Sequence, residues 1–266
     1  MDSDVPRSAD KTARAASLGL RACHDDAVSF QVIAPPLPRP VLFDQFWGDL
    51  TFVHWPVQPE HVAHLFPPGT RPDVFSDGLT YAGLVPFFMG HSALGTSLRL
   101  PYFGRFAETN IRLYTIDDAG RHGVLFRSLE TQRLVVVGFT RAMMGVPYTW
   151  AKMHVTQRDG EISYSSVRRW PARGLRSTVR IRIGDEVTPS PLEVWLTARW
   201  GAHTLKAGRT WWVPNQHGPW PLHEAQILDL EDDLLAAGGV TFTGERMRAL
   251  FSPGVHARFG RPSRVN

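Results

Sequence analysis

Short extended runs separated by turn residues dominate this sequence, and they restrict its fold more than any other feature. Runs of this kind, bounded by Gly, Pro, Asn, Asp or Ser, are typical of strands in a sandwich or barrel. The predicted strands cover residues 50–55, 79–89, 107–116, 124–129, 134–139, 152–157, 162–169, 175–183 and 210–213. Helices are predicted only for residues 58–66, 191–200 and 229–237. The last prediction rests on the acidic residues 231–233, which suit a first turn, and on the glycines at 238–239, which suit a helix end.

Chain length and cysteine content limit the class of protein. The chain has 266 residues and a single cysteine, Cys23, so it can bury a core without disulfides and fits a reducing compartment. Residues 1–40 are predicted to form a flexible tail that ends in the proline-rich stretch 34–40, and residues 41–266 a single domain. No apolar run reaches the length of a membrane helix, so a cytoplasmic protein without a membrane partner is expected.

The net charge of +4 is concentrated in one part of the chain. Residues 158–182 contain seven arginines and only two acidic residues. From 176 to 183 the arginines alternate with small or apolar residues, which predicts a strand with one buried and one solvated face. A nucleic-acid partner is the less favoured alternative, because no stacking aromatic side chains interleave with these arginines.

The sequence lacks the motifs of several common nucleotide-binding and metal sites. The sequence contains no Gly-x-Gly-x-x-Gly turn after a strand and no Walker-type phosphate loop, so no nucleotide cofactor is expected. His61 and His64 are spaced to share one face of a helix, as metal ligands do, but no third ligand with suitable spacing follows. No cofactor and no metal site are therefore predicted.

A polar face in the predicted strand 107–116 suggests a binding site. In an extended chain Glu108, Asn110 and Arg112 point to one side, and Ile111 and Leu113 point to the other. Glu108 and Arg112 then lie about 13 Å apart, so they cannot pair along the strand, but Asn110 could share a small ligand with either. The alternative is that this face is simply exposed to water.

The segment 140–155 contains further polar candidates. It turns at residues 145–147 and then runs extended, with Trp150, Lys152 and His154 on one face. Lys152 could stack on the Trp150 ring as a cation, or it could bury its alkyl stem and direct its ammonium group to water.

These two segments also carry a family resemblance. Together with the motifs FWGDL (46–50), GVLFRSLE (123–130), HGPWPL (217–222) and FSPGV (251–255), they resemble the YqjF-like family of uncharacterised proteins over about residues 41–260. That family in turn resembles acetoacetate decarboxylase. The resemblance implies an α+β, β-rich fold, an antiparallel barrel or cone that encloses a small-molecule cavity and carries a few outer helices.

The resemblance also implies a loss of the decarboxylase chemistry. That enzyme forms a Schiff base through a lysine of an adjacent pair that follows a Gly-x-Pro turn. Here Gly145-Val146-Pro147 is followed by Tyr148 and Thr149, and Lys152 comes too late to be equivalent. Glu108 does match the position of an acidic cavity residue of the decarboxylases.

Two function hypotheses follow. The first is an enzyme that acts on a small polar or carboxylated molecule. Its general acid or base would be Glu108, helped by Tyr148 or His154, and its ligand-binding residues would be Asn110, Arg112, Arg141 and Lys152. The alternative is a non-catalytic protein that binds a small molecule in the same cavity. A homo-oligomer is compatible with either.

Overall fold

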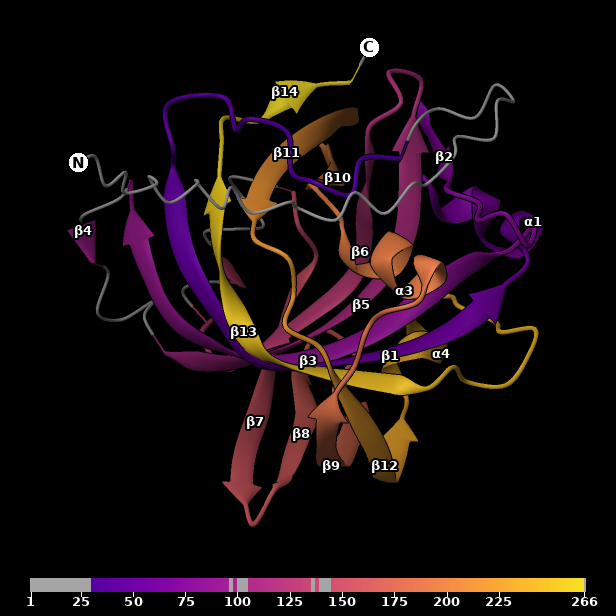
Figure 1. Cartoon of the computed structure of the whole chain (residues 1–266). Coiled ribbons are helices and arrows are strands. Elements are labelled where there is room, and N and C mark those ends of the chain that lie inside the picture. The colour runs from indigo at the N-terminus through magenta and orange to yellow at the C-terminus, as the bar shows by residue number, and fades with distance from the viewer. Residues whose placement is uncertain (1–29, 96–97, 100–104, 135–136, 139–144, 266) are drawn as a thin grey trace, which may run out of the picture.

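The computed structural model describes residues 30–95, 98–99, 105–134, 137–138 and 145–265. Fourteen strands account for most of the described residues, and the helices there are short (Figure 1). The strands are β1 Phe43–Val57, β2 Thr70–Pro72, β3 Thr80–Leu94, β4 Leu98–Arg99, β5 Phe106–Asp117, β6 His122–Thr131, β7 Tyr148–Arg158, β8 Glu161–Trp170, β9 Arg176–Glu186, β10 Gly201–Lys206, β11 Arg209–His217, β12 His223–Asp232, β13 Ala249–Phe259 and β14 Ser263–Arg264. The helices whose two ends are both described are α1 Pro59–Val62, the 3-10 turn η1 Ala63–Leu65, α3 Pro191–Thr197 and α4 Leu234–Ala237. The strand-rich prediction is confirmed.

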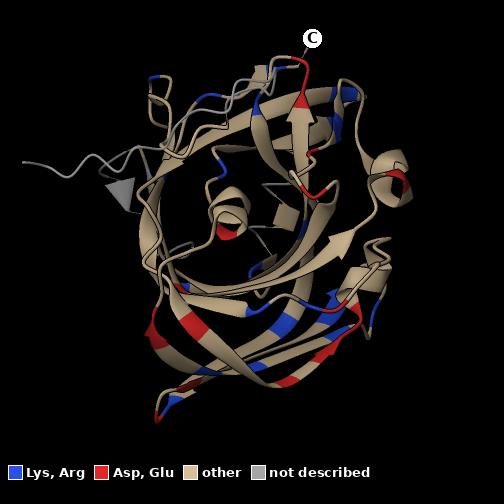
Figure 2. Cartoon of the chain, turned by 45° about the vertical axis from the view of Figure 1, so that its right-hand side comes forward, with Lys and Arg blue, Asp and Glu red and all other residues tan. Residues whose placement is uncertain are grey.

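Seven strands form a closed ring of hydrogen-bonded neighbours. The order around it is β1, β3, β5, β6, β10, β11 and β13, and β13 pairs with β1 to complete it. Figure 2 shows the strands curving round into this ring. Most pairings are antiparallel as expected, but β6 pairs in parallel with both β7 and β10.

A second layer, formed by β7, β8, β9 and β12, lies below the ring in Figure 1. The largest apolar cluster lies between this layer and the strands β1, β3 and β5. Its members include Val53, Leu84, Ile111, Ile162 and Ile181, all with no exposed surface. The alternating faces of β1, β3 and β5 therefore separate an apolar core on one side from the interior of the ring on the other.

The predicted alternation of β9 is confirmed. Val179 and Ile181 are buried, whereas Arg180 and Arg182 are exposed and lie 3.9 and 2.7 Å from the carboxylate of Glu161 on β8. Acidic residues of the neighbouring β12 lie beside this strand, and Figure 2 shows both signs of charge along these lower strands. The arginines thus line a mixed, solvated surface.

Two element predictions are wrong. Residues 134, 137 and 138 are helical rather than extended, and the Val137 amide donates to the Arg133 carbonyl in the helical pattern. The first half of the predicted helix 229–237 is strand, because residues up to Asp232 continue the ladder with β9, and only Leu234–Ala237 is helical. The predicted helices near 58–66 and 191–200 are confirmed with shorter bounds.

The segment before β1 contacts the domain. The Trp200 indole N–H donates to the Gln31 carbonyl at 2.6 Å, and the Phe30 ring packs edge-on against His122. Residues 1–29 lie outside the described residues, so the flexible tail stays a prediction for them, but residues 30–31 are not free of the domain. None of the helices in the described part of the chain has the length and apolar character that a membrane crossing requires.

Candidate functional site

A cavity of about 400 Å³ lies inside the ring of strands. This volume falls within the roughly 300–1,000 Å³ typical of small-molecule sites. Most of its wall is apolar, formed by side chains such as Trp47, Phe87, Phe126 and Phe259. The polar side chains that line it are Gln45, Ser92, Glu108, Asn110, Arg112, Tyr148, Thr197, Arg199, Thr204, Asn215 and His217.

Glu108 is a buried carboxyl group on β5. Its side chain is 3% exposed, and the Tyr148 hydroxyl donates a hydrogen bond of 3.0 Å to its Oε2. Burial raises the pKa of Glu108 to about 8, although the bond from Tyr148 acts in the opposite direction. Burial also raises the pKa of Tyr148 well above its ordinary value. At neutral pH both groups are therefore uncharged, and Glu108 carries a proton that it can donate.

Arg112, two residues beyond Asn110, supplies a positive charge. Its Nε and Nη2 donate to the Tyr114 hydroxyl at 3.1 and 2.9 Å, and Nη2 also donates to the Leu196 carbonyl at 3.3 Å. A guanidinium can only donate, so the Tyr114 oxygen accepts, and its own proton is free to bond His54 Nε2 at 2.7 Å. Burial lowers the pKa of His54 well below its ordinary value, so the ring is neutral. These partners orient Arg112 without neutralising it.

Arg199 is a second, deeply buried guanidinium. It follows α3, is 4% exposed, and lies 3.9 Å from the centre of the Trp195 ring. It forms an ion pair with Asp73, which also bonds His122 Nδ1 at 2.8 Å. Burial opposes the ionisation of Asp73, but the bonds from His122 and Arg199 lower its pKa overall. The charge of Arg199 is thus balanced, and among the described residues of this part of the cavity Arg112 supplies the unbalanced charge.

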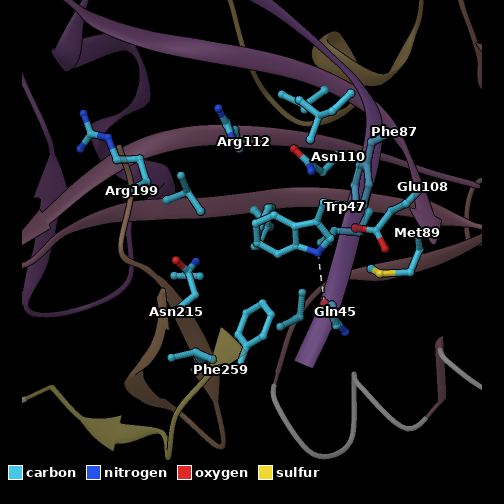
Figure 3. A pocket seen from close by; sticks show the side chains of 18 of the residues that line it. Gln45, Trp47, Phe87, Met89, Glu108, Asn110, Arg112, Arg199, Asn215 and Phe259 are labelled. Atoms are coloured by element: carbon cyan, nitrogen blue, oxygen red, sulfur yellow. Dashed lines mark hydrogen bonds between the residues drawn. The ribbon is translucent and has the colours of Figure 1, made fainter. Parts of the chain in front are cut away.

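Several buried polar atoms of the cavity wall have no hydrogen-bond partner among the described residues. They are Asn110 Oδ1, Asn215 Oδ1, Thr204 Oγ1 and Arg199 Nη2. Leaving a buried polar atom unpaired costs roughly 1–3 kcal/mol, so such atoms are rarely left unsatisfied. Figure 3 shows that Asn110, Asn215, Arg199 and Arg112 lie on several sides of the cavity. Their positions suit a polar molecule inside it.

Aromatic rings form much of the remaining wall. The Trp47 indole stacks on Trp220 at 6.2 Å between ring centres, and its N–H donates to Gln45 Oε1 at 3.1 Å. In the view of Figure 3, Trp47 lies between Glu108 on one side and Arg199 on the other. His217 lies 6.1 Å from Trp47, and burial lowers the pKa of His217 to about 4. The apolar part of a ligand can therefore stack on these rings, while its polar groups contact the charged Arg112 and the neutral Glu108.

The structure brings together four of the seven site residues that the sequence predicts. Glu108, Asn110, Arg112 and Tyr148 all line the cavity. Arg141 lies outside the described residues.

Lys152 and His154 do not reach the cavity. Both are exposed on β7, and they alternate with the buried Ala151 and Met153 as the pattern predicts. The exposed face of β7 is not the cavity face, because β7 pairs with the ring strand β6 only at residues 148–150 and then continues into the second layer. Neither side chain is in a position to act on a ligand of this cavity.

Sequence reasoning missed Arg199, Asn215 and His217 as cavity residues. Arg199 lies in the short connection between α3 and β10, where no periodic pattern marks it. His217 and Trp220 belong to the motif HGPWPL, which signals the family but does not show which way its side chains point.

The cavity provides no metal centre among the described residues. Its lining includes one carboxylate, Glu108, and one imidazole, His217, which is fewer than the three protein ligands of typical catalytic metal sites. None of the described lining residues is a lysine.

Comparison with known sequences identifies relatives of this chain. Residues 44–256 match the model of the family DUF2071, whose description is "Uncharacterized conserved protein". The chain is 27% identical over 200 residues to the uncharacterized protein YqjF of Bacillus subtilis, covering 74% of this chain and 81% of that protein.

Comparison with solved structures identifies the fold. An acetoacetate decarboxylase from Legionella pneumophila matches with a TM-score of 0.60 and 13% identity, covering 93% of this chain and 98% of that one. The enduracididine biosynthesis enzyme MppR in complex with pyruvate matches with a TM-score of 0.57 and 13% identity, covering 86% and 91%. The expected acetoacetate-decarboxylase-like fold is thus confirmed.

Proposed function

The chain belongs to the DUF2071 family, and from the cavity it encloses we propose that it binds a small organic acid and transfers a proton to it. The observation that carries the proposal is the neutral, buried Glu108 in a largely apolar cavity that also contains Arg112. The fold neighbours support the class of ligand, since MppR was solved in complex with pyruvate, a small keto acid.

Charge in the cavity favours an anion. Arg112 is oriented by a phenol and a backbone carbonyl, and neither carries a negative charge. Because Glu108 is protonated at neutral pH, it does not repel a carboxylate or cancel the charge of Arg112. A carboxylate bound at Arg112 would form a charge-assisted hydrogen bond in a site with little water, which is among the stronger polar contacts in proteins.

The opposite end of the cavity suits a carbonyl oxygen. Glu108 is held in place by Tyr148, and its proton is available to a ligand atom that accepts hydrogen bonds. A buried carboxylic acid that stays neutral at pH 7 can polarise a carbonyl group or protonate an enolate, which is general acid catalysis. Glu108 is the general acid of this proposal, and Tyr148 is the residue that positions it.

Lysine chemistry is not part of the proposal. Where the resemblance to the decarboxylases implies two adjacent lysines, this chain has Tyr148 and Thr149, and Lys152 is exposed. Incubation with acetoacetate and borohydride should therefore add no mass to any peptide of the protein. A borohydride adduct on Lys152 would contradict this point and favour a Schiff-base enzyme.

Two measurements test the function itself. The full chain purified under mild conditions should release a small carboxylic acid on denaturation, detected by mass spectrometry, and the Arg112→Gln variant should release much less. A panel of keto acids and enol-type compounds, assayed for product, then separates an enzyme from a non-catalytic binding protein. Saturable binding without turnover would support the binding protein, and release of no organic acid together with no binding of the panel would contradict both.

A further inference from the structure

Two histidines and an aspartate meet on the outer wall of the ring, away from the cavity. Asp44 Oδ1 lies 3.6 Å from His91 Nε2 and 3.8 Å from His256 Nδ1. The three ligand atoms all lie within 4.8 Å of one another. They come from three neighbouring strands, since β1 carries Asp44, β3 carries His91 and β13 carries His256.

The register of these strands explains the meeting. His91 and His256 are both paired with Phe46, one on each side of β1. Asp44 precedes Phe46 by two residues, so it points to the same face of the strand. The residues on either side of Phe46, Gln45 and Trp47, line the cavity on the opposite face. The cluster is therefore separate from the proposed ligand site.

Close packing holds the centre of the cluster in place. A Cβ atom at Gly48, Gly90 or Gly254 would lie 2.7, 2.6 or 2.9 Å from the Phe46 ring, so the ring lies directly on the backbone of all three strands. Glycine is required for so close an approach.

The two imidazoles stand on either side of this fixed ring. His91 is parallel to Phe46 with an interplanar angle of 8°, and His256 lies 5.1 Å from it. The packing thus fixes the positions from which the two rings reach Asp44.

From this geometry we infer that Asp44, His91 and His256 bind a divalent transition-metal ion such as Zn²⁺. Zinc is bound at about 2.0–2.2 Å by imidazole and carboxylate, so tetrahedral ligand atoms lie about 3.3 Å apart. The two carboxylate–imidazole distances are within about half an ångström of that value, and the two imidazole nitrogens lie within 4.8 Å of each other, so side-chain rotation must bring the three atoms onto one ion.

The surroundings of Asp44 suit a metal ligand. Arg258 donates to its other oxygen, Oδ2, at 3.0 Å, which leaves Oδ1 directed at the two histidines. Hydrogen bonds of this kind orient ligating carboxylates in metal sites. Two imidazoles with one carboxylate favour Zn²⁺, Ni²⁺ or Cu²⁺ over Mg²⁺ and Ca²⁺, which prefer sets of oxygen ligands. The ion would link the ring strands β1, β3 and β13 on the face opposite the cavity.

Calorimetric titration of the chelator-treated full chain with ZnCl₂ tests the inference. We expect one Zn²⁺ ion to bind this cluster, and the melting temperature to rise in zinc, because a ligand that binds only the folded state stabilises it. His256→Gln and Asp44→Asn should each weaken binding about tenfold or more. MgCl₂ should produce neither effect.

A matched control separates this cluster from other histidines. His61 and His64 are exposed and lie on α1 and η1, so the His61→Ala/His64→Ala variant should bind zinc as the unaltered chain does. The His256 side chain is 64% exposed, so His256→Gln should melt normally without metal, and it carries the test even where Asp44→Asn folds poorly. Zinc binding that is unchanged in His256→Gln, or no zinc binding by the unaltered chain, would overturn the inference. The Arg112→Gln variant should still bind zinc, which makes this result independent of the proposed function.

Discussion

The Tyr148 hydroxyl donates a hydrogen bond of 3.0 Å to Oε2 of Glu108, and this bond joins two strands, β7 and β5, that meet at the cavity. Burial keeps the carboxyl group protonated at neutral pH, whereas the bond from Tyr148 favours its ionised form. The protonation state of Glu108 is thus set by two opposing effects, each of which can be changed separately.

The pH dependence of stability should reveal the raised pKa of Glu108. Its pKa is about 8 in the folded chain against an ordinary value of 4.5, so between these values the folded state binds a proton that the unfolded state releases. Stability must therefore fall as pH rises through this window, by about 1.4 kcal/mol per pH unit for this one group.

The Glu108→Gln variant should lack this fall, and denaturant unfolding of both chains between pH 6.5 and 8 measures the difference. His217 and Asp232 also titrate in or near this range, but they contribute alike to both chains, so the difference between the two profiles isolates Glu108. Parallel pH profiles of the two chains would show that Glu108 is ionised at neutral pH.

Removing the Tyr148 hydroxyl should raise the pKa of Glu108 further. In Tyr148→Phe the carboxylate loses a donor that stabilises its charge, and the stability of the fold should fall by about 1 kcal/mol. The midpoint of the pH transition, measured by unfolding at a series of pH values, should move upward. The double variant Tyr148→Phe/Glu108→Gln should show no transition, and a downward shift in Tyr148→Phe would contradict the assigned bond.

Glu108 and Arg112 should interact only when Glu108 is ionised. At about 13 Å and an effective dielectric constant of about 20, two opposite charges attract by about 1 kcal/mol. A double-mutant cycle of Glu108→Gln and Arg112→Gln on unfolding free energy should therefore show coupling near pH 9 and none beyond about 0.5 kcal/mol at pH 6. Arg112→Lys, which keeps the charge, serves as the control and should retain the coupling. Equal coupling at both pH values would contradict a neutral Glu108.

The segment before β1 should contribute to stability. Phe30 lies 5.4 Å from the Arg199 guanidinium, and the Gln31 carbonyl accepts the Trp200 indole proton. A chain that begins at Val41 should melt several degrees below a chain that begins at Phe30, since about 1 kcal/mol corresponds to roughly 2–4 °C at this size. Equal melting temperatures would restore the expectation that everything before residue 41 is a tail.

The sequence could predict which residues of β5 face the cavity but not which face of β7 does. In β5 the polar Glu108, Asn110 and Arg112 alternate with buried apolar residues, and the ring encloses that polar face. In β7 the same alternation places Lys152 and His154 together, but period alone does not distinguish a cavity from solvent. That distinction depends on where β7 separates from the ring strand β6, and this position is set by the whole topology.

The helix predicted for residues 229–237 is wrong at its start, where the acidic residues belong to the end of β12. Residues 231–233 suit the first turn of a helix, yet Glu231 and Asp232 pair with Thr178 and Ser177 of β9 and continue the sheet. Tertiary pairing overrides local preference here, and only Leu234–Ala237 is helical. The burial of Arg199 could not be predicted from the local sequence either, because it depends on an ion pair with Asp73, which is distant in sequence.

Calorimetric titration with phenylpyruvate and other keto acids, against the neutral amide 3-phenylpropanamide, tests the central claim most directly. The claim is that the cavity binds a small carboxylate at Arg112. At pH 7 the unaltered chain should bind at least one of the keto acids about tenfold or more tightly than the amide, and Arg112→Gln should remove that preference, because the charge-assisted bond contributes about 1.5–3 kcal/mol. Equal affinity for acids and amide in the unaltered chain, or an unchanged preference in Arg112→Gln, would contradict the claim.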